Sequence, residues 1–393
     1  MTRRRVAITG LGVVAPCGIG VDAYWQGLLS TVVEGERRVP DFDPVPYFDN
    51  PKEARRTDRF AQFALAAAAM ALEHAGELEA NPARTGVLLG TGVGGLLTLE
   101  EQILVYYNKD PRRVSPFLVP MMMANAGAAA ISMRYGFKGP CETTVTACAA
   151  GTHAIGNAAR AIMDGRCDVV LAGGTEASMT PVALQGFNNM TATSRSGISR
   201  PFDRERDGFM MAEAGAVLVL EDLEHARARG AAVLAEVLGS ASTADAYHIT
   251  APSPGGGGAV ACMELALQDA GLRPEDIRHI NAHGTSTPLN DAAEAQALAK
   301  VFGLPGPIVT STKGVTGHAL GAAGAIEAMA VVLSMAHRLV PPTANTTAVD
   351  PELPAIDLVV GEARPWEPGP SLSNSFGFGG HNGTLVIGPA PEC

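Results

Sequence analysis

The segment Val145-Thr146-Ala147-Cys148-Ala149-Ala150-Gly151-Thr152 leads from a β-rich run into an alanine-rich stretch that continues to residue 163. This change of pattern predicts a tight turn at the start of a helix, with Cys148 in the turn. Free backbone N–H groups at a helix start stabilise a thiolate, so we expect a lowered pKa for this cysteine. Taken alone, the segment fits a small buried thiol equally well. The other five cysteines have no comparable setting and are interpreted as structural.

Outward from this segment, short β-branched runs bounded by glycine alternate with alanine-rich stretches. The predicted strands cover residues 6–9, 86–89, 168–172, 216–220, 232–238, 277–282, 308–312 and 384–387. The predicted helices cover residues 59–75, 151–163, 257–270, 292–301 and 324–337. This alternation predicts an α/β protein with sheets and helices in layers. The 393 residues contain neither a flexible linker nor a clear repeat, which favours one unit built from two fused halves.

Composition narrows the class of protein. The formal net charge of −11 disfavours nonspecific nucleic-acid binding. We expect no membrane span, because the richest apolar stretches are short or carry a charge such as Glu327. The basic N-terminus runs into residues 6–14, where two glycines indicate a strand rather than a signal peptide. The six cysteines form no C-x-x-C pair, which predicts reduced thiols, a cytoplasmic location and no metal site.

Two histidines follow predicted strands directly. His283 lies in Asn281-Ala282-His283-Gly284-Thr285-Ser286-Thr287-Pro288, and His318 ends Lys313-Gly314-Val315-Thr316-Gly317-His318. Loops at strand ends are where α/β proteins place their sites. A lone loop histidine is more often structural than catalytic. Two such histidines together with a cysteine at a helix start favour a catalytic site.

The fourth segment is Ser373-Asn374-Ser375-Phe376-Gly377-Phe378-Gly379-Gly380-His381-Asn382. Glycine on both sides of Phe378 allows the backbone to approach a ligand closely. By itself this stretch is better explained as a glycine-rich turn before the last strand.

Taken in order, the four segments resemble the β-ketoacyl-acyl-carrier-protein synthases of the thiolase superfamily, most closely the type II elongating enzymes. The resemblance runs from residues 6–12 (VAITGLG) to residues 377–380 (GFGG), and includes residues 111–117, 200–209 and 245–248. It implies a five-layered αβαβα fold of two related halves, which we place at residues 1–240 and 241–393. It also implies a homodimer, although a heterodimer with a related subunit is an alternative.

The resemblance assigns roles to individual side chains. Cys148 is similar to the nucleophile that takes the acyl chain, while His283 and His318 resemble the pair that promotes malonyl decarboxylation. The remaining matches are Lys313 and Glu327, which organise the site; Thr285 and Thr287, which bind pantetheine; Phe378 with Gly377 and Gly379, which form a gate; and Asp291, a structural acid. The chemistry requires backbone donors for a tetrahedral intermediate, which we expect from the N–H groups of Cys148 and Phe378. No metal or redox cofactor is implied, because the substrates are carried on the phosphopantetheine arm of acyl-carrier protein.

An acidic carrier protein requires local positive charge on this acidic chain. The candidate carrier-binding residues are Arg55, Arg56, Arg59, Arg112, Arg113 and Arg195. Arginines 200, 204 and 206 are interleaved with acids, so we interpret them as ordinary solvated arginines or internal ion-pair partners.

Three features depart from the family pattern. Ala212 replaces a glycine, His381 stands where a small residue is common, and the loop at residues 191–199 is short. These differences leave the chemistry intact, but the family's chain-length preference and carrier recognition are not carried over to this chain.

Several functions compete with fatty acid elongation. A ketosynthase of a type II polyketide or polyene pathway would share every catalytic residue. A thiolase would need a second cysteine in a C-x-G setting, whereas Cys393 is merely the last residue. A non-catalytic partner subunit would typically lack the nucleophile, and a Cys-His hydrolase of another fold would leave His318 and Phe378 unexplained.

Overall fold

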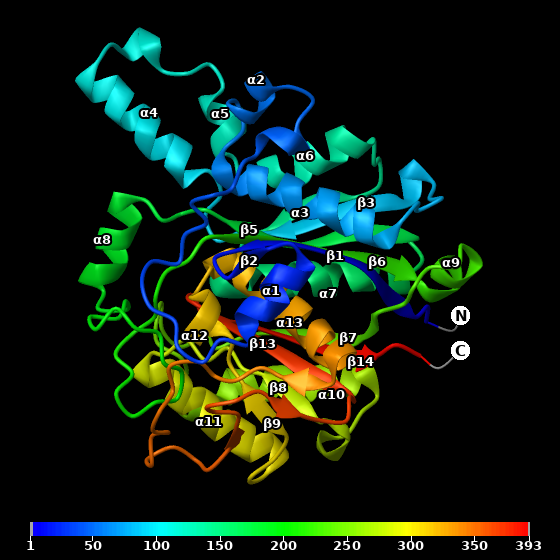
Figure 1. Ribbon diagram of the computed structural model, residues 1–393, viewed down its shortest axis with the longest axis vertical. Helices are drawn as coiled ribbons and strands as arrows, with labels where there is room; N and C mark the ends of the chain where they lie inside the picture. The colour runs from blue at the N-terminus through cyan, green and yellow to red at the C-terminus, as the bar shows by residue number, and fades with distance from the viewer. Residues whose placement is uncertain (1–2, 392–393) are drawn as a thin grey trace.

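Most strands of the protein belong to one hydrogen-bonded sheet that is folded into two halves (Figure 1). The structure, a computed structural model, describes residues 3–391. The first half contains β1 (Val6–Ala15), β2 (Gly18–Ile19), β3 (Thr85–Gly90), β4 (Cys141–Thr144), β5 (Val169–Glu176) and β6 (Ala214–Asp222). The second contains β7 (Ala235–Ala244), β8 (His279–Asn281), β9 (Ile308–Thr310), β11 (Asp357–Leu358), β13 (Ser371–Gly377) and β14 (His381–Pro389). A short antiparallel contact between β1 and β7, with Val6 opposite Val237, joins the halves.

Helices fill the space between the two halves and cover their outer faces (Figure 1). Helices α3 (Arg59–Ala75) and α6 (Ala126–Tyr135) cover the first half, and α10 (Gly257–Ala270) and α11 (Pro288–Phe302) cover the second. Helices α7 (Ala150–Met163) and α13 (Ala323–His337) lie between them. The predicted five-layered α/β fold is therefore confirmed.

The remaining elements are shorter or lie at the periphery. The helices are α1 (Val21–Leu28), α2 (Pro51–Ala54), α4 (Leu96–Asn108), α5 (Leu118–Met122), α8 (Pro181–Asn189), α9 (Leu223–Ala228) and α12 (Lys313–Thr316). The 3₁₀ turns are η1 (Val45–Tyr47), η2 (Pro82–Arg84), η3 (Pro111–Arg113), η4 (Ala147–Ala149), η5 (Pro254–Gly256), η6 (Pro274–Asp276) and η7 (Leu320–Ala322). Strands β10 (Leu339–Val340) and β12 (Arg364–Pro365) form a separate pair.

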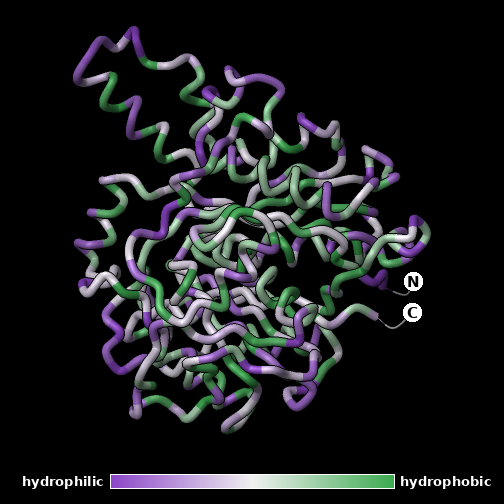
Figure 2. Tube along the Cα trace, viewed as in Figure 1, coloured by the Kyte–Doolittle hydropathy of each residue, from purple (hydrophilic) through white to green (hydrophobic). Residues whose placement is uncertain are grey.

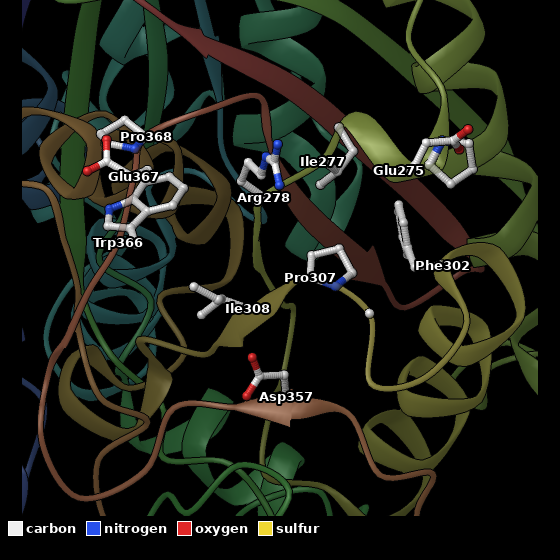
Figure 3. Close-up of a pocket in the computed structure, with 12 residues that line it drawn as sticks. Glu275, Ile277, Arg278, Phe302, Pro307, Ile308, Asp357, Trp366, Glu367 and Pro368 are labelled. Atoms are coloured by element: carbon white, nitrogen blue, oxygen red, sulfur yellow. The ribbon is translucent and has the colours of Figure 1, made fainter.

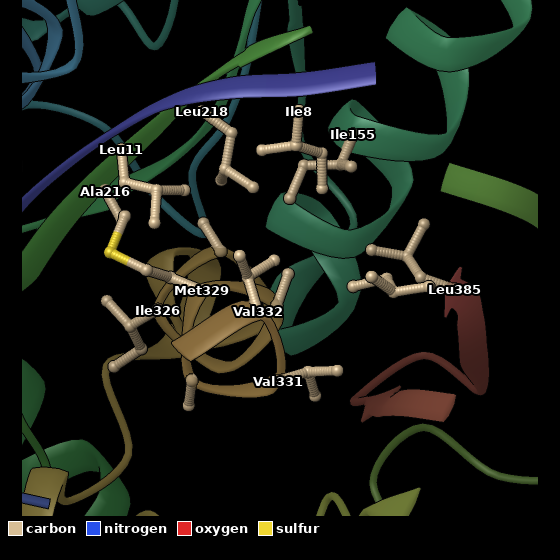
Figure 4. Close-up of a cluster of buried hydrophobic side chains, with 14 of the residues drawn as sticks. Ile8, Leu11, Ile155, Ala216, Leu218, Ile326, Met329, Val331, Val332 and Leu385 are labelled. Atoms are coloured by element: carbon tan, nitrogen blue, oxygen red, sulfur yellow. The ribbon is translucent and has the colours of Figure 1, made fainter. Parts of the chain in front are cut away.

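Helix α13 is the centre of the hydrophobic core. Every residue from Ala323 to Met335 is buried, as expected for a helix that is apolar on all sides. Met329 and Val332 project towards Leu218 from the first half, while Val331 lies near Leu385 from the second (Figure 4). Figure 2 shows that hydrophilic residues are concentrated in the peripheral loops. One core thus holds both halves in a fixed relation.

One stretch, Leu320–His337, has the length and apolar composition of a membrane span. In the structure it comprises η7 and α13, and 89% of it is buried inside the protein. Its apolar character is explained by its place in the core.

The observed elements differ from the predicted ones in several places. Strand β7 begins at Ala235 and continues to Ala244, because its C-terminal part pairs with β14. The predicted boundary between the two halves, at residues 240/241, therefore falls inside β7. This strand pairs mainly with β14 of the second half. Strand β13 was not predicted, because its polar side chains from Ser371 to Ser375 are all buried. Helix α4 and the segment after it also escaped prediction, and they project from the body (Figure 1).

Candidate active site

Three parallel strand ends and one helix start converge on a single cavity. Strands β9, β8 and β13 are neighbours in parallel register, so the loops that follow them meet at one edge. These loops carry His318, His283 and Phe378, respectively. Cys148 enters from the first half, in turn η4 just before α7. All four residues line one cavity of about 480 Å³.

A sharp turn presents Cys148 to the cavity. Ala147, directly before it, has a φ of 49°, which is unusual for a residue with a side chain. Gly377 packs on this turn, and a Cβ there would lie 3.0 Å from the Thr146 carbonyl oxygen and 3.1 Å from the Cys148 nitrogen. The end of β13 can therefore approach the turn that carries Cys148 only with glycine at position 377.

Cys148 and His318 form a close pair. The His318 Nε2 atom lies 3.0 Å from the Cys148 Sγ atom, and both residues are buried. Burial raises the pKa of the Cys148 thiol to about 11, although the Phe378 N–H and Lys313 oppose this shift. Burial, assisted by Lys313, also holds the pKa of His318 well below its ordinary value. The pair is therefore a neutral thiol facing a neutral imidazole, and the lowered cysteine pKa expected from the helix start is wrong because desolvation outweighs it.

This protonation state predicts a characteristic pH dependence. Only the thiolate is alkylated, so the alkylation rate of Cys148 by iodoacetamide should rise about tenfold per pH unit between roughly pH 7 and 10. The rate is measured by intact mass, with a small free thiol, which levels off earlier, as the reference. A rate that is flat between about pH 6 and 8 would instead indicate a thiolate–imidazolium pair.

Lys313 and Glu327 support His283 from behind. The Lys313 Nζ atom donates to the His283 carbonyl oxygen at 2.5 Å, lies 3.4 Å from His283 Nδ1, and forms an ion pair with Glu327. A neutral imidazole that accepts at Nδ1 carries its proton on Nε2. Burial raises the pKa of Glu327 to about 7, opposed by Lys313. The His283 and His318 rings lie 5.3 Å apart at nearly right angles. Because Nδ1 of His283 faces Lys313, its Nε2–H is the donor that remains for the cavity.

Three groups that hold these loops were missed in the sequence. Glu294 accepts the His283 and Gly284 N–H groups, both at 2.8 Å, and burial raises its pKa to about 7. Glu176 accepts the N–H groups of residues 92 and 321 at 2.6 Å and 3.1 Å. His153 accepts from the Thr146 hydroxyl at 2.8 Å and donates to the carbonyl oxygen of residue 382 at 3.0 Å. The only sequence signal was the three-residue spacing of Asp291 and Glu294 on one helix face.

The predicted structural acid and the two threonines lie around the same loop. Asp291 is buried and accepts the Phe202 N–H at 2.8 Å. The Thr285 and Thr287 hydroxyls lie 2.9 Å apart and line the cavity. Thr287 also caps α11 by accepting the Asn290 N–H at 3.3 Å.

Phe378 lines the same cavity as Cys148. Its ring lies 6.4 Å from that of Phe187, and its neighbour Gly379 has a φ of 85°, a conformation that favours glycine. The Gly379 N–H donates to the Ile249 carbonyl oxygen at 2.8 Å. The His381 ring lies against Gly379, where a Cβ would be 3.1 Å from it, so the departure at position 381 touches the gate segment directly.

Replacing Phe378 with alanine should widen access to Cys148. We expect faster alkylation by bulky maleimides and reduced discrimination between acyl chains. The loss of kcat/KM should stay well below the roughly 10²–10³-fold effect of losing an oxyanion donor, because the backbone N–H remains. Phe378→Leu, which keeps an apolar side chain, is the matched control. Unchanged labelling rates and chain selectivity would contradict a gating role.

The predicted carrier-binding arginines fall in different environments. Arg56 lies over the Phe117 ring at 4.4 Å, which brings Arg55 and Arg56 close to the segment after Arg112 and Arg113. These four arginines are exposed. Arg112 pairs with Asp110 at 2.8 Å and is 90% exposed, and Arg195 is exposed in the loop after α8.

Arg59 differs from the other arginines. It forms a bidentate ion pair with the buried Glu213 and donates to the Val39 carbonyl oxygen. Glu213 already neutralises its charge inside the protein, so Arg59 offers no free positive charge to a carrier protein. Arg200 pairs with the interleaved Glu205 at 3.3 Å, whereas Arg206 pairs with the distant Asp350 at 2.6 Å. Arg204 is exposed and forms no ion pair within residues 3–391.

A second cavity lies at the opposite ends of β8 and β9 (Figure 3). It is larger, about 760 Å³, and is lined by charged residues such as Arg278 and Asp357 around Trp366. Neither Cys148 nor the histidine pair lines it. The smaller cavity is therefore the candidate active site.

This fold and site define a class: thiolase-like proteins with a buried cysteine and two histidines in one cavity. Residues 31–226 match the family described as "Beta-ketoacyl synthase, N-terminal domain", and residues 234–347 match its "C-terminal domain". The chain belongs to the β-ketoacyl synthase family. It is 45% identical to the 3-oxoacyl-[acyl-carrier-protein] synthase 2 of Synechocystis sp., covering 98% of each chain.

Solved structures of ketosynthases superpose closely on this chain. The ishigamide ketosynthase/chain length factor has a TM-score of 0.92 at 33% identity, covering 99% of this chain and 100% of the other. A type II PKS acyl-carrier protein in complex with its ketosynthase bound to the hexaketide gives a TM-score of 0.89 at 31% identity, with the same coverage.

Proposed function

We propose that the protein condenses an acyl group held on Cys148 with a malonyl group carried by acyl-carrier protein, releasing CO₂ and a β-ketoacyl-carrier thioester. The observation that carries this proposal is the placement of Cys148 Sγ opposite two neutral imidazoles in one buried cavity. The curated relatives, named as 3-oxoacyl-[acyl-carrier-protein] synthases, support the same reaction.

The first step is acyl transfer to Cys148. The thiol gives its proton to His318 Nε2, 3.0 Å away, as sulfur attacks the carbonyl carbon of the incoming thioester. The intermediate oxyanion accepts from the backbone N–H groups of Cys148 and Phe378. Collapse expels the carrier thiolate, which takes the proton from His318. The products are acyl-Cys148 and the free carrier thiol, so the histidine ends as it began.

The second step breaks the bond between the malonyl carboxylate and its methylene carbon. CO₂ leaves, and the electron pair becomes an enolate whose oxygen accepts from the His283 Nε2–H, with His318 facing the same space. The enolate carbon attacks acyl-Cys148, and the cysteine leaves as a thiolate that takes one proton from water. The proposed reaction uses no metal ion or redox cofactor, and we place it in the cytoplasm, where thiols stay reduced.

Carrier protein is the proposed partner. Thr285 and Thr287 offer adjacent hydroxyls on the cavity wall to the amides of a pantetheine arm. The exposed arginines 55, 56, 112, 113 and 195 offer charge to an acidic carrier.

We propose that the protein acts as a homodimer. Strand β4 ends the strand path, and one edge of it is unpaired within residues 3–391. Helix α6 packs beside β4 and exposes Met133 (78%), and Val145 just after β4 is 51% exposed. A second copy related by a two-fold axis would pair antiparallel at β4 and cover these side chains. Light scattering should give twice the 40.5 kDa chain mass; a monomer would point instead to a related subunit, as in the ketosynthase/chain length factor structures.

A polyketide ketosynthase is the second candidate, favoured by the type II PKS structure. Intact-mass spectrometry after incubation with acyl-carrier thioesters, followed by malonyl-carrier protein, tests both. Saturated acyl adducts on Cys148 that convert to β-ketoacyl product support fatty acid elongation. Acylation only by polyketide-type chains supports the alternative. No adduct with any acyl group would contradict both proposals.

A further inference from the structure

The catalytic triad has the donor set of a zinc site. One donor atom each from Cys148, His283 and His318 lies within 4.8 Å of the others, and all three residues are buried. Thiolate sulfur and imidazole nitrogen at such separations suit tetrahedral Zn²⁺ or Co²⁺, with a fourth position left open. A site that must keep a free cysteine therefore needs a feature that opposes metal binding.

Lys313 supplies that feature through the His283 tautomer. Its three ammonium N–H groups face three acceptors: the His283 carbonyl oxygen, Glu327 and His283 Nδ1. Acceptance at Nδ1 puts the imidazole proton on Nε2, the nitrogen that faces the cavity. A nitrogen that carries a proton cannot bind a metal. In zinc sites the arrangement is reversed, because the outer nitrogen donates to a carboxylate and the inner nitrogen holds the lone pair.

The positive charge of Lys313 acts in the same direction. It lies close enough to both histidines and to Cys148 to disfavour additional positive charge there. A divalent cation in the cavity would meet the same repulsion.

We infer that Lys313 keeps this triad free of thiophilic divalent metals, and that its removal would convert the triad into a Zn²⁺-type site. Glu327 would become the outer carboxylate, because Glu327 and His283 Nδ1 both face the same Nζ atom. One Glu327 oxygen has no hydrogen-bond partner among the described residues and is free to accept the Nδ1–H. The inference concerns the same side chains as the proposed reaction but does not depend on its substrates.

Lys313→Met tests this inference, because methionine keeps the length of the chain and removes its donors and charge. Titrated with Co²⁺, the variant should develop the charge-transfer absorption of a cobalt–thiolate bond, and the wild type should not at the same concentrations. The gain in affinity should be at least about 10–100-fold, the usual effect of an outer-shell change. The double variant Lys313→Met/Cys148→Ser should lose the band, and Lys313→Arg should resemble the wild type.

Two outcomes would overturn the inference: wild-type protein that binds Co²⁺ as tightly as the variant, or a folded variant that binds none. If Lys313→Met does not fold, the wild type still decides. Its Cys148 should be alkylated equally fast with and without equimolar Zn²⁺, whereas protection by Zn²⁺ would overturn the inference. None of these measurements requires turnover, so they remain informative even if the proposed reaction is wrong.

Discussion

The variant Cys148→Gln is expected to lose condensation by about 10⁴-fold or more while still releasing CO₂ from malonyl-carrier protein. The acyl group has no sulfur to occupy in this variant, so chain transfer stops. The substitution leaves His283, the proposed hydrogen-bond donor to the enolate, untouched. Acetyl-carrier protein should therefore accumulate, measured by mass spectrometry of the carrier.

Cys17→Ala is a matched control, because Cys17 is half-buried and does not line the cavity. That variant should keep both activities. Retained condensation in Cys148→Gln would exclude Cys148 as the nucleophile. Loss of decarboxylation in a folded Cys148→Gln protein would mean that the thiol itself takes part in breaking the carbon–carbon bond.

The layered fold was predictable because its buried elements have simple patterns. Helix α13 is apolar on every side, and the helix that covers residues 59–75 was predicted with the observed bounds. Strand β13 was not predictable in this way, since its serines and asparagine are buried through partners elsewhere in the chain. The Thr384 hydroxyl, for example, donates to Asn374 Oδ1 at 2.9 Å across the β13–β14 pair.

The position of the reacting groups was predictable for a different reason. Cys148, His283 and His318 each follow an element whose end is marked by glycine or by a change of pattern, and parallel strand ends meet at one edge. Their protonation was not predictable from local sequence. Complete burial raises the pKa of Cys148 to about 11, and the tautomer of His283 depends on Lys313, 30 residues further along the chain.

The roles of the buried carboxylates Glu294 and Glu176 were also not predictable from local sequence. Glu294 and Glu176 hold backbone N–H groups of loops. Glu176 reaches the Gly321 N–H, 145 residues further along the chain, and Glu294 accepts from a loop that only the tertiary structure brings onto its helix. An isolated glutamate in a helix or at a strand end predicts a solvated charge. Burial raises the pKa of Glu176 to about 7, an environment that only the tertiary structure reveals.

Variants of the two histidines should separate the two half-reactions. His283→Ala is expected to slow malonyl decarboxylation by about 10²–10³-fold, the usual effect of removing one donor from a developing oxyanion. Acylation of Cys148 should stay close to the wild-type rate, because the thiol proton goes to His318 at 3.0 Å. His318→Ala should instead slow acylation and decarboxylation together. Intact mass reports the first step, and CO₂ release from malonyl-carrier protein reports the second.

The variant His283→Gln tests whether His283 acts as a hydrogen-bond donor or as a base. A glutamine amide places an N–H donor near the position of the imidazole Nε2, so decarboxylation should recover in part relative to alanine. Recovery would show that His283 acts as a donor of a hydrogen bond and not as a base, in agreement with the tautomer that Lys313 imposes. Equal losses in the glutamine and alanine variants would exclude a purely donor role. Slowed acylation in His283→Ala would show that the two histidines act as one unit, and the division of labour proposed from their positions would be wrong.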